Sequence, residues 1–263
     1  LIVITDFDAT LTTGDSEQCH DVMGNSKLLC AKFRKEFAPL MDWTTNTNID
    51  GVEWWDKAHS LMVSHGMPPR NNIPRLVRDS KMVPRPGALE LLARLEELGI
   101  PVLIVSAGLS DVIEEFLRQH GALSENVTVC SNRLNYAADS APKSVSPAPP
   151  ITSFTKAYAY KSASSFFTTH CNRRALIVLG DSVTDVDACE NVPSDHVLSV
   201  DPHPRTRRAR RLHPRDAEEG AAAGDLRRRD AVVALADLVP DDGQPVVVAT
   251  RCVGDKSAVI GPG

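Results

Sequence analysis

The sequence predicts an α/β fold: a doubly wound, mostly parallel, Rossmann-like sheet with a small helical cap domain inserted after the first strand. Short, continuous runs rich in Val, Ile and Leu are typical of parallel strands that are covered on both faces. Helical patterns alternate with these runs, as in doubly wound sheets. Between residues 16 and 82 strand-like runs are absent and helical patterns replace them.

Each expected element follows from its own stretch of sequence. The expected strands are residues 1–5 (LIVIT), 100–105 (IPVLIV), 127–130 (VTVC), 175–179 (ALIVL) and 197–200 (VLSV). Helices are expected over residues 87–98 and 110–120, where apolar residues recur at helical spacing and Gly99 and Gly121 follow as stop signals.

A cap domain is expected from the helical patterns at residues 26–41 and 51–65. An insertion directly after the first strand would lie over the carboxyl end of that strand, where open α/β sheets bind ligands. We therefore expect a core of residues 1–15 and 83–263 and a cap of residues 16–82. The alternative is a helical pair packed on the flank of the sheet.

Two segments have unusual composition. Residues 139–153 are rich in Pro, Ser and Ala and predict a mobile loop. Residues 205–229 are Arg-rich without clear periodicity, so residues 205–263 are compatible with an irregular tail. Within that tail, residues 231–239 and 246–249 are compatible with a helix and a strand.

The composition excludes several classes of protein. With 263 residues, 42% of them hydrophobic and 24% charged, the chain resembles an ordinary globular protein, and no apolar run reaches the ~20 residues of a membrane span. A net charge of −5 argues against a protein that coats nucleic acid. The six cysteines form no C-x-x-C pair, which favours a reducing, cytoplasmic setting. We expect a monomer or weak oligomer, and a natural beginning upstream of Leu1.

The strongest chemical signal is Asp6 and Asp8, two residues apart directly after the first apolar run. One carboxylate at such a position can attack an electrophile while the other transfers a proton to and from oxygen. The alternative is a pair of surface acids in a turn.

A second acidic signal follows the run at residues 175–179. Asp181 and Asp185 stand four residues apart in the segment GDSVTD. If the two strands are neighbours, these carboxylates face Asp6 and Asp8, and such a cluster requires a hard cation such as Mg²⁺. The alternative is that Asp181 or Ser182 only caps the next helix.

Two further residues can hold phosphate. Ser106, followed by Ala107 and Gly108, lies between a strand and the expected helix at residue 110, so its hydroxyl and nearby backbone N–H groups predict a phosphate site. Lys156 can neutralise phosphate charge. The alternatives are a serine cap and a solvated surface lysine.

These elements, in this order, resemble the haloacid dehalogenase superfamily of aspartate-nucleophile phosphotransferases. More narrowly, they resemble the cytosolic pyrimidine 5'-nucleotidase family over residues 1–200. The narrower resemblance is carried by VEWWDKAH at 52–59, VSAG at 105–108, DVIEE at 111–115, SNR at 131–133, FTK at 154–156 and LGDS at 179–182. Where the family's cap has an acidic residue for the nucleobase, residues 44–48 read TTNTN.

The resemblance implies a Mg²⁺-dependent 5'-nucleotidase that hydrolyses pyrimidine nucleoside 5'-monophosphates through an aspartyl phosphate. The implied roles are Asp6 as nucleophile, Asp8 as acid and base, Asp6, Asp8, Asp181 and Asp185 around the metal, and Ser106, Ala107 and Lys156 on the phosphate. Trp54 is a candidate for stacking on the base, with packing in the cap as the alternative.

Three other functions stay open. One is a phosphatase with the same cap that acts on phosphoserine or a sugar phosphate. Another is a non-catalytic binding module on this scaffold. The last is an RNA-associated protein that acts through the Arg-rich residues 205–211.

Overall fold

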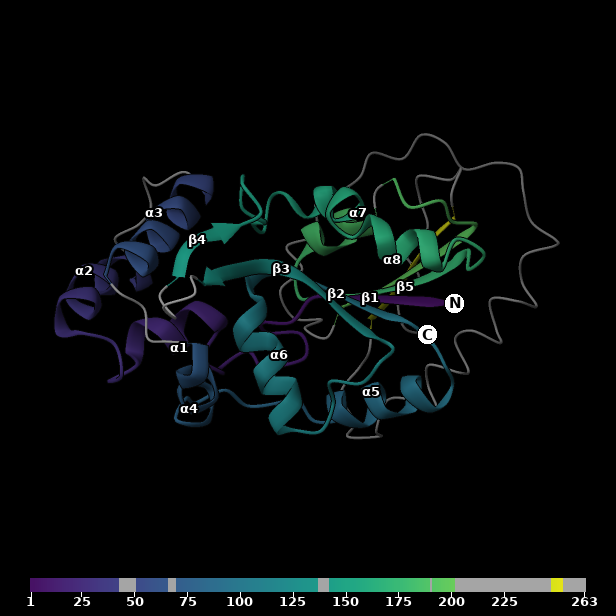
Figure 1. The fold of residues 1–263 in the computed structure, drawn as a ribbon. Helices are drawn as coiled ribbons and strands as arrows, with labels where there is room; N and C mark the ends of the chain where they lie inside the picture. Colours follow the sequence, from purple (N-terminus) through teal and green to yellow (C-terminus); the bar gives the residue numbers. More distant parts are fainter. Residues whose placement is uncertain (43–50, 66–69, 137–141, 190, 202–246, 253–263) are drawn as a thin grey trace.

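The sheet of the protein is mostly parallel, as predicted. The structure, a computed structural model, describes residues 1–42, 51–65, 70–136, 142–189, 191–201 and 247–252. Within these residues, seven strands lie in the order β4-β3-β2-β1-β5-β6-β7 (Figure 1). They are β1 (Ile2–Thr5), β2 (Val102–Leu109), β3 (Val127–Tyr136), β4 (Pro142–Ser146), β5 (Ala175–Leu179), β6 (His196–Asp201) and β7 (Val247–Cys252). Only β4 and β7 pair antiparallel with their neighbours among these strands, which confirms the doubly wound, mostly parallel fold.

The central strand β1 lies between two strands, β2 and β5, that carry or precede other candidate site residues. Val3 pairs with Val102 of β2 on one side and with Ile177 of β5 on the other. Every residue of β1 is buried, as expected of a strand covered on both faces. Because β1, β2 and β5 are parallel and in register, the segments that follow them leave the same edge of the sheet.

Helices cover both faces of the sheet. They are α1 (Cys19–Asn25), α2 (Ala31–Met41), α3 (Gly51–Ser64), α4 (Ile73–Arg78), α5 (Ala88–Glu97), α6 (Ser110–Gln119), α7 (Ala159–Ser162) and α8 (Ser164–Thr169), with 3-10 helices η1 (Arg70–Asn72), η2 (Lys156–Tyr158) and η3 (Val183–Cys189). In Figure 1, α5 and α6 lie on one face and α7 and α8 on the other. Two separate clusters of buried apolar side chains match these two faces.

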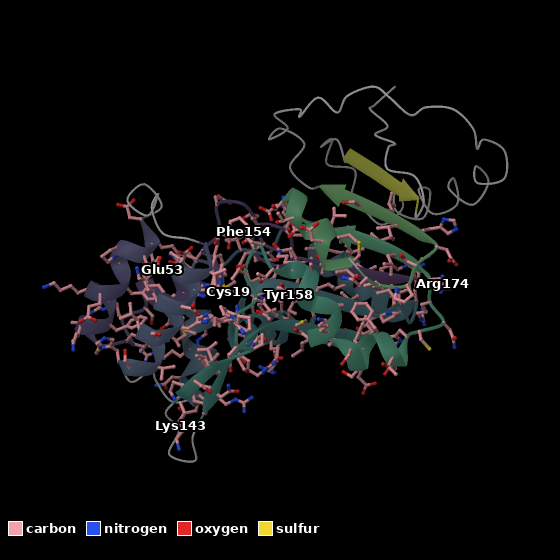
Figure 2. The ribbon with its side chains drawn as sticks, turned by 90° about the horizontal axis from the view of Figure 1, so that it is seen from above. Cys19, Glu53, Lys143, Phe154, Tyr158 and Arg174 are labelled. Carbon is pink, nitrogen blue, oxygen red and sulfur yellow. The ribbon has the colours of Figure 1, made fainter. Side chains whose placement is uncertain are left out.

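The helices α1 to α4 lie beyond the carboxyl ends of the central strands (Figure 1). Seen from above, Glu53 of α3 and Arg174, next to β5, lie on opposite sides of Cys19 (Figure 2). This arrangement places a group of helices over the sheet edge that carries Asp6. The division of the chain into a core and a cap of residues 16–82 stays a prediction.

The expected helix over residues 26–41 is wrong at its beginning. Helix α2 begins at Ala31, and a separate helix, α1, precedes it. Ser26 ends α1 in an extended conformation, and its hydroxyl accepts a hydrogen bond from the backbone N–H of Leu28. Cys30 then caps α2, since its sulfur accepts from the N–H of Phe33. Side-chain capping therefore divides a stretch that reads as one helix by apolar spacing alone.

The expected loop over residues 139–153 is also wrong in part, because β4 lies within it. Leu134 of β3 pairs with Val145 of β4 in an antiparallel ladder. Pro142 begins the strand, a position where its missing N–H costs little. Lys143 on this edge strand is exposed.

The Arg-rich tail lies mostly outside the described residues, as does the expected helix over residues 231–239. The exception is β7, which pairs antiparallel with β6. The strand expected at residues 246–249 is therefore confirmed, and it extends to Cys252.

Candidate active site

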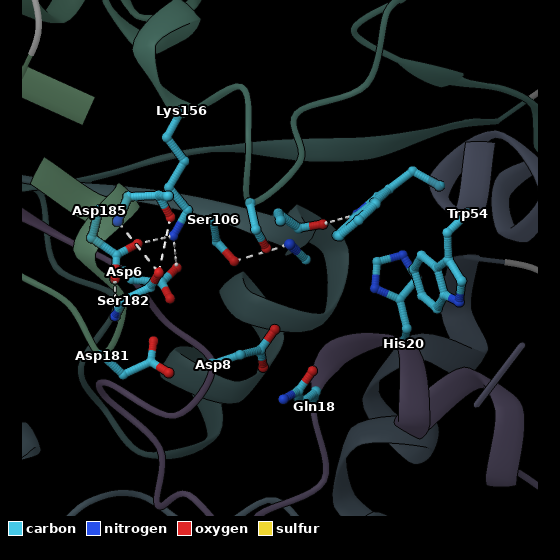
Figure 3. Close-up of a pocket in the computed structure, with 15 residues that line it drawn as sticks. Asp6, Asp8, Gln18, His20, Trp54, Ser106, Lys156, Asp181, Ser182 and Asp185 are labelled. Atoms are coloured by element: carbon cyan, nitrogen blue, oxygen red, sulfur yellow. Dashed lines mark hydrogen bonds and ion pairs between the residues drawn. The ribbon is translucent and has the colours of Figure 1, made fainter. Parts of the chain in front are cut away.

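The turn after β1 carries Asp6 and Asp8. The backbone N–H of Asp6 donates to the carbonyl of Leu179 at 2.9 Å, so the residue still follows the sheet. Phe7, between the two acids, is fully buried and packs edge-on against Phe116. Both carboxyl groups line one pocket (Figure 3).

The segment after β5 meets this turn. The backbone N–H of Asp181 donates to the hydroxyl of Thr10 at 3.0 Å, which joins two loops far apart in the sequence. Asp6, Asp181 and Asp185 each offer a carboxylate oxygen, and these oxygens lie within 4.8 Å of one another. The neighbouring strands β1 and β5 thus bring the two predicted acidic motifs together.

A short 3-10 turn fixes Asp185. Its Oδ2 accepts a hydrogen bond from the backbone N–H of Ser182 at 2.8 Å, and its own N–H donates to the carbonyl of Ser182 at 3.0 Å. Gly180 packs against this carboxylate, because a Cβ at that position would lie 2.2 Å from the Cβ of Asp185. A glycine at position 180 is therefore a steric requirement of the site.

Lys156 lies between two of the acids. Its Nζ is 2.9 Å from Oδ1 of Asp6 and also contacts Oδ1 of Asp185. All three side chains are buried. Burial alone would lower the pKa of Lys156, but the two adjacent carboxylates raise it, so the side chain is a permanent cation.

Burial shifts both predicted catalytic acids in the same direction. It raises the pKa of Asp8 to about 7, against hydrogen bonds from Cys19. Burial also raises the pKa of Asp6, and the charge of Lys156 opposes this shift. Asp8 can therefore carry a proton near neutral pH, as a general acid must.

The surroundings of Asp8 are tightly packed. Its Oδ1 accepts a hydrogen bond from the backbone N–H of Cys19 at 3.1 Å. A Cβ at Gly108 would lie 3.0 Å from Oδ2 of Asp8 and 2.7 Å from the sulfur of Cys19. Helix α1 and strand β2 thus hold this carboxyl group from two sides.

Ser106 lies inside β2 and not at a helix N-terminus, so that part of the prediction is wrong. The strand continues to Leu109, with an irregular register between Val105 and Leu109, and α6 begins only at Ser110. Ser106 is fully buried in protein, and its hydroxyl accepts a hydrogen bond from the N–H of Gly108 at 3.0 Å. Its side chain still lines the same pocket as Asp6.

Aromatic side chains form the far wall of the pocket (Figure 3). The indole N–H of Trp54 donates to the carbonyl of Leu40, and that of Trp55 donates to the carbonyl of Ala107, both at 2.8 Å. His20 packs edge-on against Trp54, with ring centroids 5.0 Å apart. Both indole rings are therefore fixed in place.

A buried histidine pair supports this wall. The Nε2 atoms of His20 and His59 are 3.4 Å apart, so one ring donates and the other accepts. Burial lowers the pKa of His59 to about 4 and that of His20 well below its usual value. Both rings are neutral at pH 7, and His59 is packed against His20 at this wall.

All the residues predicted for the site line this single pocket: Asp6, Asp8, Trp54, Ser106, Ala107, Lys156, Asp181 and Asp185. Their individual roles stay predictions. Sequence reasoning missed Gln18 and His20, which also line the pocket. Gln18 stands at the N-cap position of α1 and His20 lies in its first turn. This short helix has no clear spacing of apolar residues, so only the closeness of both residues to Asp8 in the sequence could have indicated them.

The acidic cluster fits a divalent cation. The oxygens of Asp6, Asp181 and Asp185 are hard ligands of the kind that Mg²⁺ prefers. Three carboxylates this close repel one another, and one lysine offsets only part of their charge. Three of the four predicted carboxylates therefore form a donor set that could hold a divalent cation, and the Asp8 carboxylate is not among them.

Comparison with known proteins decides the family. The model of the pyrimidine 5'-nucleotidase (UMPH-1) family matches residues 10–201. The chain belongs to the pyrimidine 5'-nucleotidase family. This confirms the resemblance inferred from the motifs, and with it the enzyme class of 5'-nucleotidase.

The relatives of this chain are named as two kinds of 5'-nucleotidase. A 7-methylguanosine phosphate-specific 5'-nucleotidase of Gallus gallus is 30% identical over 217 residues, which cover 76% of this chain and 74% of the relative. A putative cytosolic 5'-nucleotidase 3 of Caenorhabditis elegans is 32% identical over 216 residues, or 74% of this chain and 56% of the relative.

Solved structures agree on the fold of this 5'-nucleotidase. Cytosolic 5'-nucleotidase IIIB bound to cytidine superposes with a TM-score of 0.66 at 27% identity, over 75% of this chain and 71% of that one. A haloacid dehalogenase family hydrolase of Salmonella enterica superposes at 0.52 with 15% identity, over 71% and 58%, which supports the fold alone. Among the described residues, no helix has the length and apolar character needed to cross a bilayer.

Proposed function

We propose that this 5'-nucleotidase hydrolyses nucleoside 5'-monophosphates with Mg²⁺, through a phosphorylated Asp6. The observation that carries the proposal is the position of Asp6. It lies at the end of β1 with Lys156 on one side and Asp181 and Asp185 within ligand distance. A nucleophile, a fixed cation and a candidate metal site thus share one sheet edge, as phosphoryl transfer requires.

In the first step, a carboxylate oxygen of Asp6 attacks phosphorus and the bond from phosphorus to the 5'-oxygen breaks. Asp8 donates its proton to that leaving oxygen. The raised pKa of Asp8, about 7, suits this role at neutral pH. The products of the step are the free nucleoside and an aspartyl phosphate on Asp6.

In the second step, water attacks the phosphorus of the aspartyl phosphate. Asp8, now a carboxylate, takes a proton from that water. The bond between phosphorus and the Asp6 oxygen breaks, so that inorganic phosphate leaves and both acids return to their starting states.

Lys156 and Ser106 are proposed to hold the phosphate. The ammonium group of Lys156 already contacts Asp6, so it lies where phosphate charge would arrive. Ser106 and the neighbouring Ala107 line the pocket on the β2 side. Asp6, Asp181, Asp185 and the backbone carbonyl of Asp8 are the proposed Mg²⁺ ligands. Bound Mg²⁺ supplies positive charge to the phosphate oxygens.

The nucleoside is proposed to occupy the aromatic end of the pocket, beside Trp54 and His20. Pyrimidine nucleotides follow from the family and from the relative solved with cytidine. Relatives named for 7-methylguanosine phosphate add that nucleotide to the proposed substrates. Residues 44–48, which replace the family's acidic stretch, lie outside the described residues. Because two relatives are named cytosolic 5'-nucleotidases, we also propose a cytoplasmic location.

A substrate panel tests the proposal. CMP, UMP, 7-methylguanosine monophosphate, AMP, phosphoserine and a sugar phosphate are compared with Mg²⁺ and with EDTA, using Asp6→Asn as the inactive control. We expect the highest kcat/KM for nucleoside monophosphates, with loss of turnover in EDTA. Preference for phosphoserine or the sugar phosphate would contradict the substrate class, and full activity in EDTA would contradict the metal.

A further inference from the structure

Asn132 of β3 joins the two segments that carry Ser106 and Lys156. The side chain is fully buried. Its Nδ2 donates to the carbonyl of Ala107 at 2.9 Å, of Gly108 at 3.2 Å and of Ile151 at 2.8 Å. Its Oδ1 accepts from the N–H of Ile151 at 2.9 Å. We infer that Asn132 is a positioning residue that aligns the two phosphate-binding side chains.

Asparagine suits this place because it offers both donors and an acceptor. Its amide nitrogen carries two hydrogens and donates to three carbonyl oxygens, while its amide oxygen accepts from one backbone N–H. Aspartate would turn an acceptor toward three carbonyl oxygens, and leucine would remove the side-chain hydrogen bonds that join these backbone groups.

On the β2 side, Asn132 affects Ser106 through the two residues that follow the serine, Ala107 and Gly108. The N–H of Gly108 donates to the Ser106 hydroxyl, and Asn132 holds the carbonyl of the same glycine. The carbonyl of Ala107 also accepts from Trp55 of α3. The orientation of the Ser106 hydroxyl therefore depends on a backbone segment that Asn132 fixes.

On the other side, a rigid turn connects Ile151 to Lys156. The N–H of Thr152 donates to the Thr155 hydroxyl at 2.8 Å, and the N–H of Thr155 donates to the carbonyl of Thr152 at 3.1 Å. Lys156 follows directly, at the beginning of η2. A displacement at Ile151 would therefore move the Lys156 ammonium group relative to Ser106.

The inference rests on the proposed phosphate site, so its test measures phosphate binding separately from nucleoside binding. The probes are orthovanadate, which resembles phosphate, and cytidine. The variant is Asn132→Asp. The matched control is Asn126→Asp at the amino end of the sheet, where Nδ2 donates to the carbonyl of Ile100 and Oδ1 accepts from Ser124.

We expect Asn132→Asp to raise the inhibition constant of orthovanadate about 10- to 100-fold, the size of effect that a small misplacement causes. The inhibition constant of cytidine should change less than about twofold, since the nucleoside is proposed to lie beside Trp54 and His20, and Trp54 is held by Leu40 and not by Asn132. Asn126→Asp should lower the melting temperature but leave both constants unchanged. If Asn132→Asp gives no folded protein, Asn132→Ser is measured by the same criteria.

Failure of the positioning role and failure of the proposed function give different results. A folded Asn132 variant with a wild-type inhibition constant for orthovanadate would overturn the positioning role alone. Equal weakening of orthovanadate and cytidine would also overturn it, because that pattern is general damage to the pocket. A wild-type protein that hydrolyses no nucleotide would instead refute the proposed function on which this inference rests.

Discussion

The ammonium nitrogen of Lys156 lies 2.9 Å from Oδ1 of Asp6, in a pocket where both side chains are buried. The same nitrogen contacts Asp185. One cation therefore holds Asp6, the proposed nucleophile after β1, and Asp185, after β5, in a common position. This contact links the stability of the fold to the chemistry of the site.

Removing the Lys156 cation should destabilise the protein. Lys156→Met leaves two buried carboxylates without their partner, a change that typically costs about 3–5 kcal/mol. The measurement is urea unfolding at pH 8 without Mg²⁺. The control is Lys161→Met at an exposed position of α7, which should stay within about 0.5 kcal/mol of the wild type. Equal stability of the two variants would show that Lys156 does not stabilise the buried carboxylates.

Adding a methyl group at Gly180 should disturb Asp185. The new Cβ of Gly180→Ala would lie 2.2 Å from the Cβ of Asp185, so this carboxylate must move. We expect kcat/KM to fall on the order of 10²-fold, as small misplacements do in active sites. The control is Gly121→Asn, at an exposed left-handed position with nothing within 4 Å. Unchanged turnover of Gly180→Ala would mean that the position of Asp185 is irrelevant.

Loss of Asp181 should appear in the metal requirement. Replacing groups that only support metal ligands costs about 10- to 100-fold in affinity, so Asp181→Ala should raise the half-saturating Mg²⁺ concentration at least that much. Activity titrated with Mg²⁺ measures the change. Asp187→Ala, at an exposed position of the same 3-10 helix, is the matched control. Identical Mg²⁺ curves for Asp181→Ala and the wild type would remove Asp181 from the metal site.

The buried histidine pair predicts a pH effect on stability. The folded-state pKa of His59 is about 4, below the ordinary value of 6.5, so the unfolded chain binds the extra proton first as pH falls. His59 therefore lowers the free energy of unfolding progressively as the pH falls from 6.5 to 4. Between pH 6.5 and 4, the free energy of unfolding of His59→Gln should rise relative to that of the wild type by about 1.4 kcal/mol for each unit that the pH falls. Urea unfolding at pH 7.5 and 5 measures this, and a constant difference would contradict it.

Much of the fold follows from the sequence because the strands are covered on both faces. Their apolar runs are continuous, so β1 and β5 lie within one residue of expectation. The pairing of β3 with β4 could not be predicted in this way, since an exposed edge strand with Pro142 at its beginning has no apolar signal. The boundary between α1 and α2 depends on side-chain caps, which apolar spacing does not show.

The acids of the site follow from the sequence because each stands directly after a strand, and parallel strands end at one edge. Asp6 and Asp181 are of this kind. Gln18 and His20 are different, because their places depend on how α1 packs on the sheet. Asn132 stands in the SNR motif, but its contacts depend on how the segment around Ile151 packs on the sheet. Such long-range contacts have no local signature in the sequence.

The proposed mechanism requires that Asp6 carry the phosphoryl group. The most direct measurement is rapid acid quenching of the enzyme during turnover of CMP labelled with ³²P, followed by peptide mapping of the label. We expect an acid-stable label on Asp6 in the wild type and none in Asp6→Asn, with turnover abolished in that variant. Label on another residue, or near-normal turnover by Asp6→Asn, would contradict it.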